Sequence, residues 1–218
     1  MPESLALPAL LVVGGGLLVW YLAGNELMRR RGHRLAVWSK RAVDPLGGAQ
    51  SIVWLTPQAF RLEVDAPRAA GLKRVSVTGL VESWDVPMIW LWNRWRGRRD
   101  MVVLSLSLAE QPLWGFEVFR PRSILAADAR HYAKLEGWQL EPDEDLMIAA
   151  GGDGPRQLAR RLLGVLQDER PNLIRLAARR QGALLTVALN VARPASQEPA
   201  SIAHLASRLA EQAQTVKR

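Results

Sequence analysis

The chain has 218 residues, and its 29 lysines and arginines outnumber its 21 aspartates and glutamates, so the formal net charge is +8. This charge favours anionic surfaces such as phospholipid headgroups or nucleic acid. The chain has no cysteine, which excludes disulfides, thiolate metal sites, iron–sulfur ligation and cysteine nucleophiles.

The first predicted element is a membrane anchor. Residues 5–23, LALPALLVVGGGLLVWYLA, carry no charge, and a helix of this run is roughly 28 Å long, close to the thickness of a hydrocarbon core. No lysine or arginine precedes the run, which argues against a cleaved signal peptide. Arg29, Arg30, Arg31 and Arg34 follow it, so the positive-inside rule predicts that the N-terminus lies outside and the rest of the chain is cytoplasmic.

Two features of this run predict contacts within and beside the bilayer. Trp20 and Tyr21 lie where an aromatic belt is expected at the membrane surface. Gly14, Gly15 and Gly16 lie in the middle of the run, and three successive glycines expose the backbone to a neighbouring helix. Glycine is also common in membrane helices without such a contact, and both interpretations stay open.

The next elements alternate with a period of two, which is typical of strands. A hairpin is predicted with Thr56-Pro57 as its turn. Further strands follow, and together they predict a largely antiparallel sheet with one wet face. The inward positions are Ile52, Trp54, Phe60, Leu62, Val64, Val75, Val77, Gly79, Leu104, Leu106, Leu108, Trp114, Phe116 and Val118.

After Arg120 the pattern becomes helical. Ser123 is the expected N-cap of a helix over residues 124–136, and Gly137 is the expected residue after its end. Pro142 is expected to open a short helix that ends at Gly151.

The remaining elements complete an α+β domain. Residues 153–155 are expected to open a helix with one apolar face, and a hairpin turned at Gln181-Gly182 is expected over residues 173–189. Residues 200–216 predict a terminal amphipathic helix. We divide the chain into an anchor (1–24), a basic juxtamembrane segment (25–50) and a cytoplasmic α+β domain (51–218).

One stretch carries a loose resemblance to other proteins. Residues 137–189, GWQLEPDEDLMIAAGGDGPRQLARRLLGVLQDERPNLIRLAARRQGALLTVAL, resemble a pattern in uncharacterised bacterial single-pass membrane-anchored proteins, in which a short strand, a helix, a basic hairpin and a final helix follow an N-terminal anchor. The resemblance implies a bacterial inner-membrane setting. It transfers no catalytic or binding residue.

The sequence offers little equipment for catalysis, metal binding or a cofactor. His33, His131 and His204 have no metal-ligand spacing. The cluster Glu141, Asp143, Glu144 and Asp145 lacks the glycine and final glutamate of a calcium loop, and we expect it to lie in the first turn of a helix. The glycine-rich residues 151–154 lack the Gly-Lys of a phosphate loop, so we expect a turn.

The most informative segment is residues 84–99, WDVPMIWLWNRWRGRR. Tryptophan settles at headgroup depth and arginine pairs with phosphate, so the segment predicts an interfacial membrane contact or, since both residue types are frequent in binding hot spots, a docking surface for a partner protein. The alternative is a β-hairpin whose tryptophans fill the core. The residues concerned are Trp90, Trp92, Arg94, Trp95, Arg96, Arg98 and Arg99.

Three functions are weighed, of which an enzyme is the weakest because the sequence offers no catalytic motif. The first is a non-enzymatic accessory or scaffold subunit of a larger bacterial inner-membrane complex, with a photosynthetic or respiratory complex as a suitable host. The second is a membrane-tethered module that binds an anionic ligand or lipid through residues 94–99 and Arg179-Arg180. The expected partners are anionic lipid headgroups and other membrane-protein subunits. Nucleic acid is disfavoured, because no helix-turn-helix or RNA-recognition signature accompanies the basic residues.

Overall fold

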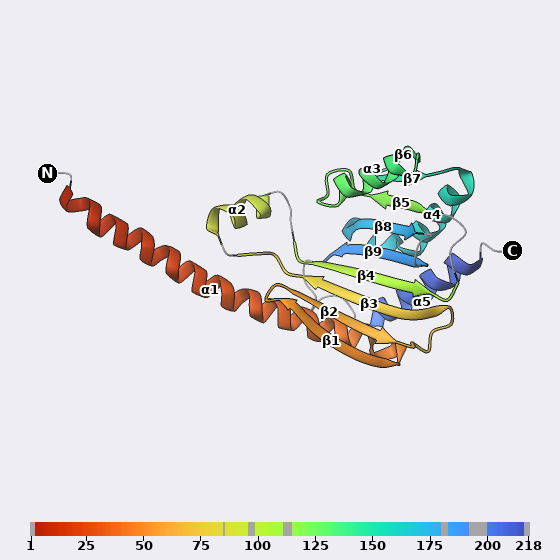
Figure 1. The fold of residues 1–218 in the computed structure, drawn as a ribbon, viewed down its shortest axis with the longest axis horizontal. Helices are drawn as coiled ribbons and strands as arrows, with labels where there is room; N and C mark the ends of the chain where they lie inside the picture. The colour runs from red at the N-terminus through yellow and green to blue at the C-terminus, as the bar shows by residue number, and fades with distance from the viewer. Residues whose placement is uncertain are drawn as a thin grey trace.

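The computed structural model describes residues 3–84, 86–95, 99–110, 115–179, 183–191 and 200–215. A long N-terminal helix projects from a mixed domain built on one sheet (Figure 1). The α+β class expected from the sequence is confirmed.

Nine strands form this sheet in the order β1-β2-β3-β4-β9-β8-β5-β7-β6, and every pair of neighbours is antiparallel. The predicted hairpins are confirmed, since β1 pairs with β2 and β8 with β9, although the expected turn at Gln181-Gly182 lies outside the described residues. The strand bounds are β1 (Ala49–Thr56), β2 (Ala59–Asp65), β3 (Leu72–Leu80), β4 (Met101–Leu108), β5 (Phe116–Phe119), β6 (Gln139–Asp143), β7 (Leu146–Ala150), β8 (Leu173–Arg179) and β9 (Leu184–Asn190).

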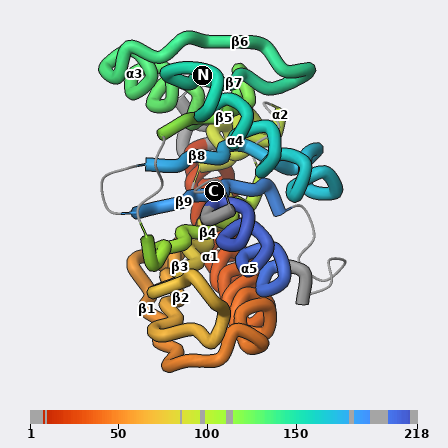
Figure 2. The backbone as a smooth tube through the Cα atoms, turned by 90° about the vertical axis from the view of Figure 1, so that its right-hand side faces the viewer, coloured from red at the N-terminus to blue at the C-terminus, as the bar shows by residue number. Residues whose placement is uncertain are grey.

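Helices cover the two faces of the sheet unequally, as Figure 2 shows. The C-terminal part of α1 (Glu3–Val43), α4 (Asp153–Val165) and α5 (Ala200–Thr215) pack on one face and share the main core with the strands. Of the helices in the described residues, α3 (Ala126–Leu135) alone packs on the other face, against β5 and β7. The burial of side chains alternates along β4 in agreement with this arrangement. Leu104 and Leu106 are buried, and Ser105 between them is half-buried.

The inward positions expected on β1 are wrong. Ile52 and Trp54 are each 45% exposed, because β1 is the edge strand of the sheet and its side chains project beyond the main core. Trp114, also expected to point inward, lies outside the described residues.

Helix α1 is unbroken from the apolar run into the domain. Residues 25–43 continue the helix, and their inward side chains enter the main core: Leu35, Ala36, Trp38, Ala42 and Val43. Fully burying one leucine-sized side chain stabilises a fold by about 1.5–3 kcal/mol. The apolar run is therefore joined to the domain by a packed helix. Two 3-10 turns, η1 (Asp44–Leu46) and η2 (Gln167–Asn172), follow α1 and α4.

The predicted helix from Pro142 to Gly151 is wrong. These residues form the hairpin β6–β7, with Glu144 at a positive φ of 55° in its turn. The alternation of buried Leu146, Ile148 and Ala150 is a strand pattern, and an edge strand such as β6 tolerates proline.

Ser123 as an N-cap is also wrong. Helix α3 begins at Ala126 and its cap residue is Leu125, while the Ser123 carbonyl accepts a hydrogen bond from the Ala126 N–H in a preceding turn. The end of the helix is as predicted, since Gly137 has the positive φ of 68° that favours glycine.

Candidate membrane interface

The apolar run of α1 is bare. Apart from Trp20, its large side chains from Leu10 to Leu22 are 53–74% exposed. Beyond the helix's own neighbouring residues, no heavy atom of the described part of the chain lies within 4 Å of the Cβ position of Gly14, Gly15 or Gly16. The helix is long and apolar enough to cross a membrane. An uncovered apolar surface of this size marks a contact with lipid or with another protein.

Three tryptophans pack together at the end of this run that is nearest the domain. The Trp20 Nε1–H donates to the Trp84 carbonyl over 2.9 Å, and the two rings stack with centroids 6.0 Å apart. The Trp90 ring lies 4.6 Å from that of Trp84 and 5.6 Å from that of Trp20. The Arg31 guanidinium lies 5.0 Å from the Trp84 ring centroid, within reach of a cation–π interaction. We call Trp20, Trp84 and Trp90 the tryptophan cluster.

Gly24 permits this close approach between α1 and the segment that follows β3. A Cβ on Gly24 would lie 3.0 Å from the Trp84 carbonyl oxygen and 3.2 Å from the Trp84 Cβ. The Trp84 backbone N–H also contacts the Met28 Sδ at 3.2 Å. The sequence interpretation had placed the functional glycines in the middle of the run, whereas the contact within the chain uses Gly24.

Helix α2 (Pro87–Trp95) contributes Trp90 to the cluster, and this contact with Trp20 holds it beside α1 (Figure 1). None of its residues is fully buried. Spacings of three and four place its outward apolar side chains on one face: Met88, Leu91, Trp92 and Trp95, which are 75%, 58%, 49% and 78% exposed. The hairpin-core interpretation is therefore wrong, because Pro87–Trp95 is helical and Trp92 is 49% exposed, outside the core.

The tip of the β1–β2 hairpin lies beside α1, just beyond the end of the apolar run. Trp54, Thr56 and Pro57 face α1 across a groove of about 980 Å³. The other wall consists of α1 residues just beyond the apolar run: Asn25, Glu26, Arg29, Arg30, His33 and Arg34. Along β1, Ile52, Val53, Trp54 and Leu55 are 45–57% exposed. Two elements distant in sequence thus flank the end of the apolar run, and both expose apolar side chains.

Glu82 is a buried carboxylate behind this surface. Its side chain is 8% exposed, and its Oε1 is buried with no hydrogen-bond partner among the described residues. Burial raises the pKa of the Glu82 carboxyl, the charge of Arg94 opposes that rise, and Asp100 adds to it. The Glu82 backbone N–H donates to Asp100 Oδ1 over 2.9 Å.

The residues selected from the sequence have different outcomes. Trp20 and Trp90 meet in the tryptophan cluster with Arg31, while Arg29 and Arg30 line the groove. Tyr21 is exposed on the apolar run, and Arg94 is exposed on α2. Arg96, Arg98 and Arg180 lie outside the described residues, and Arg99 is half-buried.

The sequence interpretation did not select Gly24, Gly32, Trp54 or Trp84 as site residues. For Gly24 and Gly32, the signal available in the sequence was a glycine within an otherwise helical stretch.

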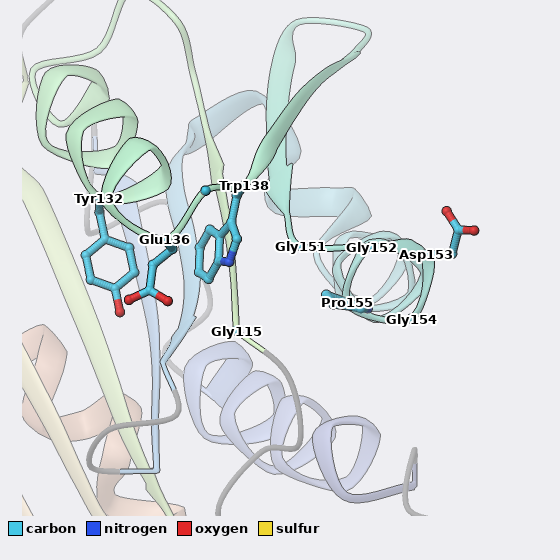
Figure 3. A pocket seen from close by; sticks show the side chains of 10 residues that line it. Gly115, Tyr132, Glu136, Trp138, Gly151, Gly152, Asp153, Gly154 and Pro155 are labelled. Atoms are coloured by element: carbon cyan, nitrogen blue, oxygen red, sulfur yellow. The ribbon is translucent and has the colours of Figure 1, made fainter.

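A second pocket lies at the far side of the domain (Figure 3), lined by Tyr132, Glu136, Trp138 and the glycines around residues 151–154. Its volume is about 720 Å³. Burial, followed by the charge of Glu136, raises the pKa of the Tyr132 hydroxyl, so this hydroxyl is neutral at physiological pH. No group of three metal-ligating side chains is found among the described residues.

The other charged residues considered from the sequence are engaged within the domain. The acidic cluster forms ion pairs with arginines: Glu141 with Arg156 and Arg160, Asp143 and Glu144 with Arg170, and Asp145 with Arg120. Its expected place in the first turn of a helix is wrong, because it lies on the β6–β7 hairpin. Arg179 lies over the Tyr132 ring and pairs with the buried Glu117 at 3.3 Å.

A scan against protein-family models found no match for this chain, and a search of curated proteins found no similar sequence.

Proposed function

We propose that this protein is a single-pass membrane protein whose domain is held against the bilayer, and that it serves as a non-enzymatic accessory or scaffold subunit of a larger bacterial inner-membrane complex. The observation that carries the proposal is the two-part character of α1. The helix is bare over its apolar run and buried over its C-terminal part.

This arrangement suits a scaffold, because one continuous helix fixes the position of the domain relative to the membrane span. The tryptophan cluster fixes α2 beside α1 as a second contact. Tryptophan prefers the headgroup region, and an amphipathic helix with an apolar face lies in the plane of the interface. A domain with two such contacts has one orientation on the membrane and can brace neighbouring subunits.

Replacing Gly14, Gly15 and Gly16 with leucine tests the subunit role. Leucine is favoured in the bilayer, so insertion should be retained. Apart from the neighbouring residues of the helix itself, none of the described residues comes within 4 Å of these positions, so the fold should also be retained. A partner helix packed on the glycines would be displaced, and we expect the partner chains to be lost from native purification followed by mass spectrometry.

The control for this experiment is a Leu17→Ala variant, because Leu17 is also exposed on the run but points away from Gly15, the middle of the glycine triplet. It should retain the partners. If the same chains co-purify at the same stoichiometry with the triple leucine variant, the glycines are not the contact. If the parent protein purifies without a stoichiometric partner, the scaffold proposal fails.

A second function is favoured by the basic groove between α1 and the β1–β2 hairpin. Three arginines line it with only one glutamate, so a module that binds an anionic lipid is consistent with the same placement on the membrane. The two functions are compatible, since bound lipid often lies between the subunits of a membrane complex.

A further inference from the structure

The groove has walls from two parts of the chain that the fold brings together. On α1, Glu26, Arg29, Arg30, His33 and Arg34 recur at spacings of three and four, so they share one face of the helix. The β1–β2 hairpin provides the second wall with Trp54, Thr56 and Pro57. Gly32 lets the hairpin approach, because a Cβ there would lie 3.2 Å from the Trp54 ring.

Two of the cationic groups in the groove have no ion pair with another described residue. Arg30 is neutralised by Glu26, with 2.6 Å between Nε and Oε1. Arg29 and Arg34 have no ion pair within the described part of the chain and are exposed. Two guanidinium groups at one opening are suited to a phosphate, which arginine can bind with two parallel hydrogen bonds.

The groove begins near the headgroup layer and extends into the water beyond it. Arg29 is six residues beyond the end of the apolar run, or about 9 Å along the helix axis, and the headgroup layer extends about 5–8 Å beyond the hydrocarbon core. Side chains on a helix lean toward its N-terminus, here toward the bilayer, so the Arg29 guanidinium reaches the layer. Arg34 is eleven residues beyond the run, or about 16 Å along the axis, and lines the part of the groove farther from the bilayer. Trp54 meets α1 between them, at Gly32, and has the amphipathic ring that is favoured at membrane surfaces.

We infer that this groove binds the phosphate headgroup of an anionic phospholipid, with Arg29 as the phosphate ligand nearest the bilayer, Arg34 adding positive charge farther out in the groove, and Trp54 packing against the headgroup between them. The inference rests on the membrane placement in the proposed function. It adds a defined lipid site, distinct from the face of α2.

Native mass spectrometry of the full-length chain released from detergent tests the inference. Phosphatidylglycerol and phosphatidylcholine are added in separate titrations, and we expect retention of one phosphatidylglycerol at concentrations where phosphatidylcholine is not retained. Replacing both Arg29 and Arg34 with glutamine should weaken the retention of phosphatidylglycerol about thirtyfold, because two basic contacts to an anionic headgroup are lost. The melting temperature should be unchanged, because both side chains are exposed.

Arg41→Gln is the matched control, since Arg41 is exposed on the same helix but does not line the groove. It should retain phosphatidylglycerol like the parent chain. Equal losses in the control and the double variant would overturn the inference, as would equal retention of the two lipids. Competition by glycerol 3-phosphate at similar concentration would also overturn it, because the site would then recognise a soluble phosphate. A parent chain that shows no preference between the two lipids but still inserts and keeps its partners would refute the lipid site and leave the proposed function standing.

Discussion

Single residues near the place where α1 leaves the apolar run matter through their size or their charge. Gly24 and Gly32 each admit an aromatic residue from a different element, Trp84 and Trp54 respectively. Glu82 lies behind them with charged neighbours from α1, α2 and the start of β4: Arg31, Arg94, Arg99 and Asp100. The carboxyl is more easily protonated in the fold than in water, because burial disfavours its charged form.

Replacing Glu82 with glutamine should stabilise the protein at neutral pH. The ordinary pKa of the carboxyl is 4.5, and the folded value is raised. Below pH 4.5 both states carry the proton and the ionisation penalty is absent. As the pH rises through the folded pKa, the parent chain loses stability and the Glu82→Gln variant, which has no carboxyl at this position, does not. Melting curves of the full chain in detergent at pH 4 and pH 8 should show a higher melting temperature for the variant only at pH 8.

Glu63→Gln is the control for this prediction. Glu63 lies half-buried on β2 and has no ion pair in the described part of the structure. Its replacement should change the melting temperature only slightly, and by the same amount at pH 4 and pH 8. If Glu82→Gln lowers the melting temperature at pH 8, attraction to the neighbouring arginines outweighs the burial cost and the sign of our argument is wrong.

Two elements, α2 and the tip of the β1–β2 hairpin, expose apolar side chains near the place where α1 leaves the apolar run. Neither element buries these side chains in the core, although each is tied to α1 through an aromatic residue. Buried helices stabilise a fold, whereas an exposed amphipathic helix has an unused apolar face that a membrane can cover.

A spin label on α2 tests this placement. The chain has no native cysteine, so Met88→Cys provides a unique attachment site at a side chain that is 75% exposed. In lipid nanodiscs, we expect the label to be accessible to oxygen, which concentrates in lipid, and shielded from a water-soluble nickel chelate. The measurement is power-saturation electron paramagnetic resonance.

Gln212→Cys provides the comparison. Gln212 is exposed near the C-terminal end of α5, at the end of the molecule opposite the apolar run in Figure 1. Its label should be accessible to the nickel chelate. If the labels at positions 88 and 212 have the same accessibility profile, α2 is solvated and the interfacial placement is refuted.

At the scale of the whole molecule, the packing of α1 in the main core makes the helix and the domain one unit. The direction in which the helix crosses the membrane therefore decides on which side all of the domain lies. By the positive-inside rule, we expect the arginines that follow the run to set this direction.

A reporter fused after residue 218 tests the orientation. The positive-inside rule predicts that a fluorescent protein which matures only in the cytoplasm will be bright at this position. Alkaline phosphatase, which is active only outside the cytoplasm, should be inactive there. The opposite pair of results would reverse the orientation and remove the cytoplasmic assignment, while leaving the contacts between α1 and the domain unaffected.

The sequence by itself determined the features that depend on local chemistry. The length and apolarity of residues 5–23 predict a span, period-two alternation predicts β1 to β4, and the spacing of the leucines on α4 predicts its buried face. The β6–β7 hairpin was mistaken for a helix because Pro142 is compatible with both a helix start and an edge strand. Only the tertiary structure decided that choice.

The tertiary structure also decided how residues distant in sequence meet. Trp20 and Trp84 are 64 positions apart, yet they share a hydrogen bond, and Trp54 reaches Gly32 from a different strand. Such contacts arise from the packing of α1 on the sheet, which no periodicity within one segment encodes. The sequence therefore determined that the chain has an apolar helix followed by basic residues, and the fold determined that those basic residues form one wall of a groove.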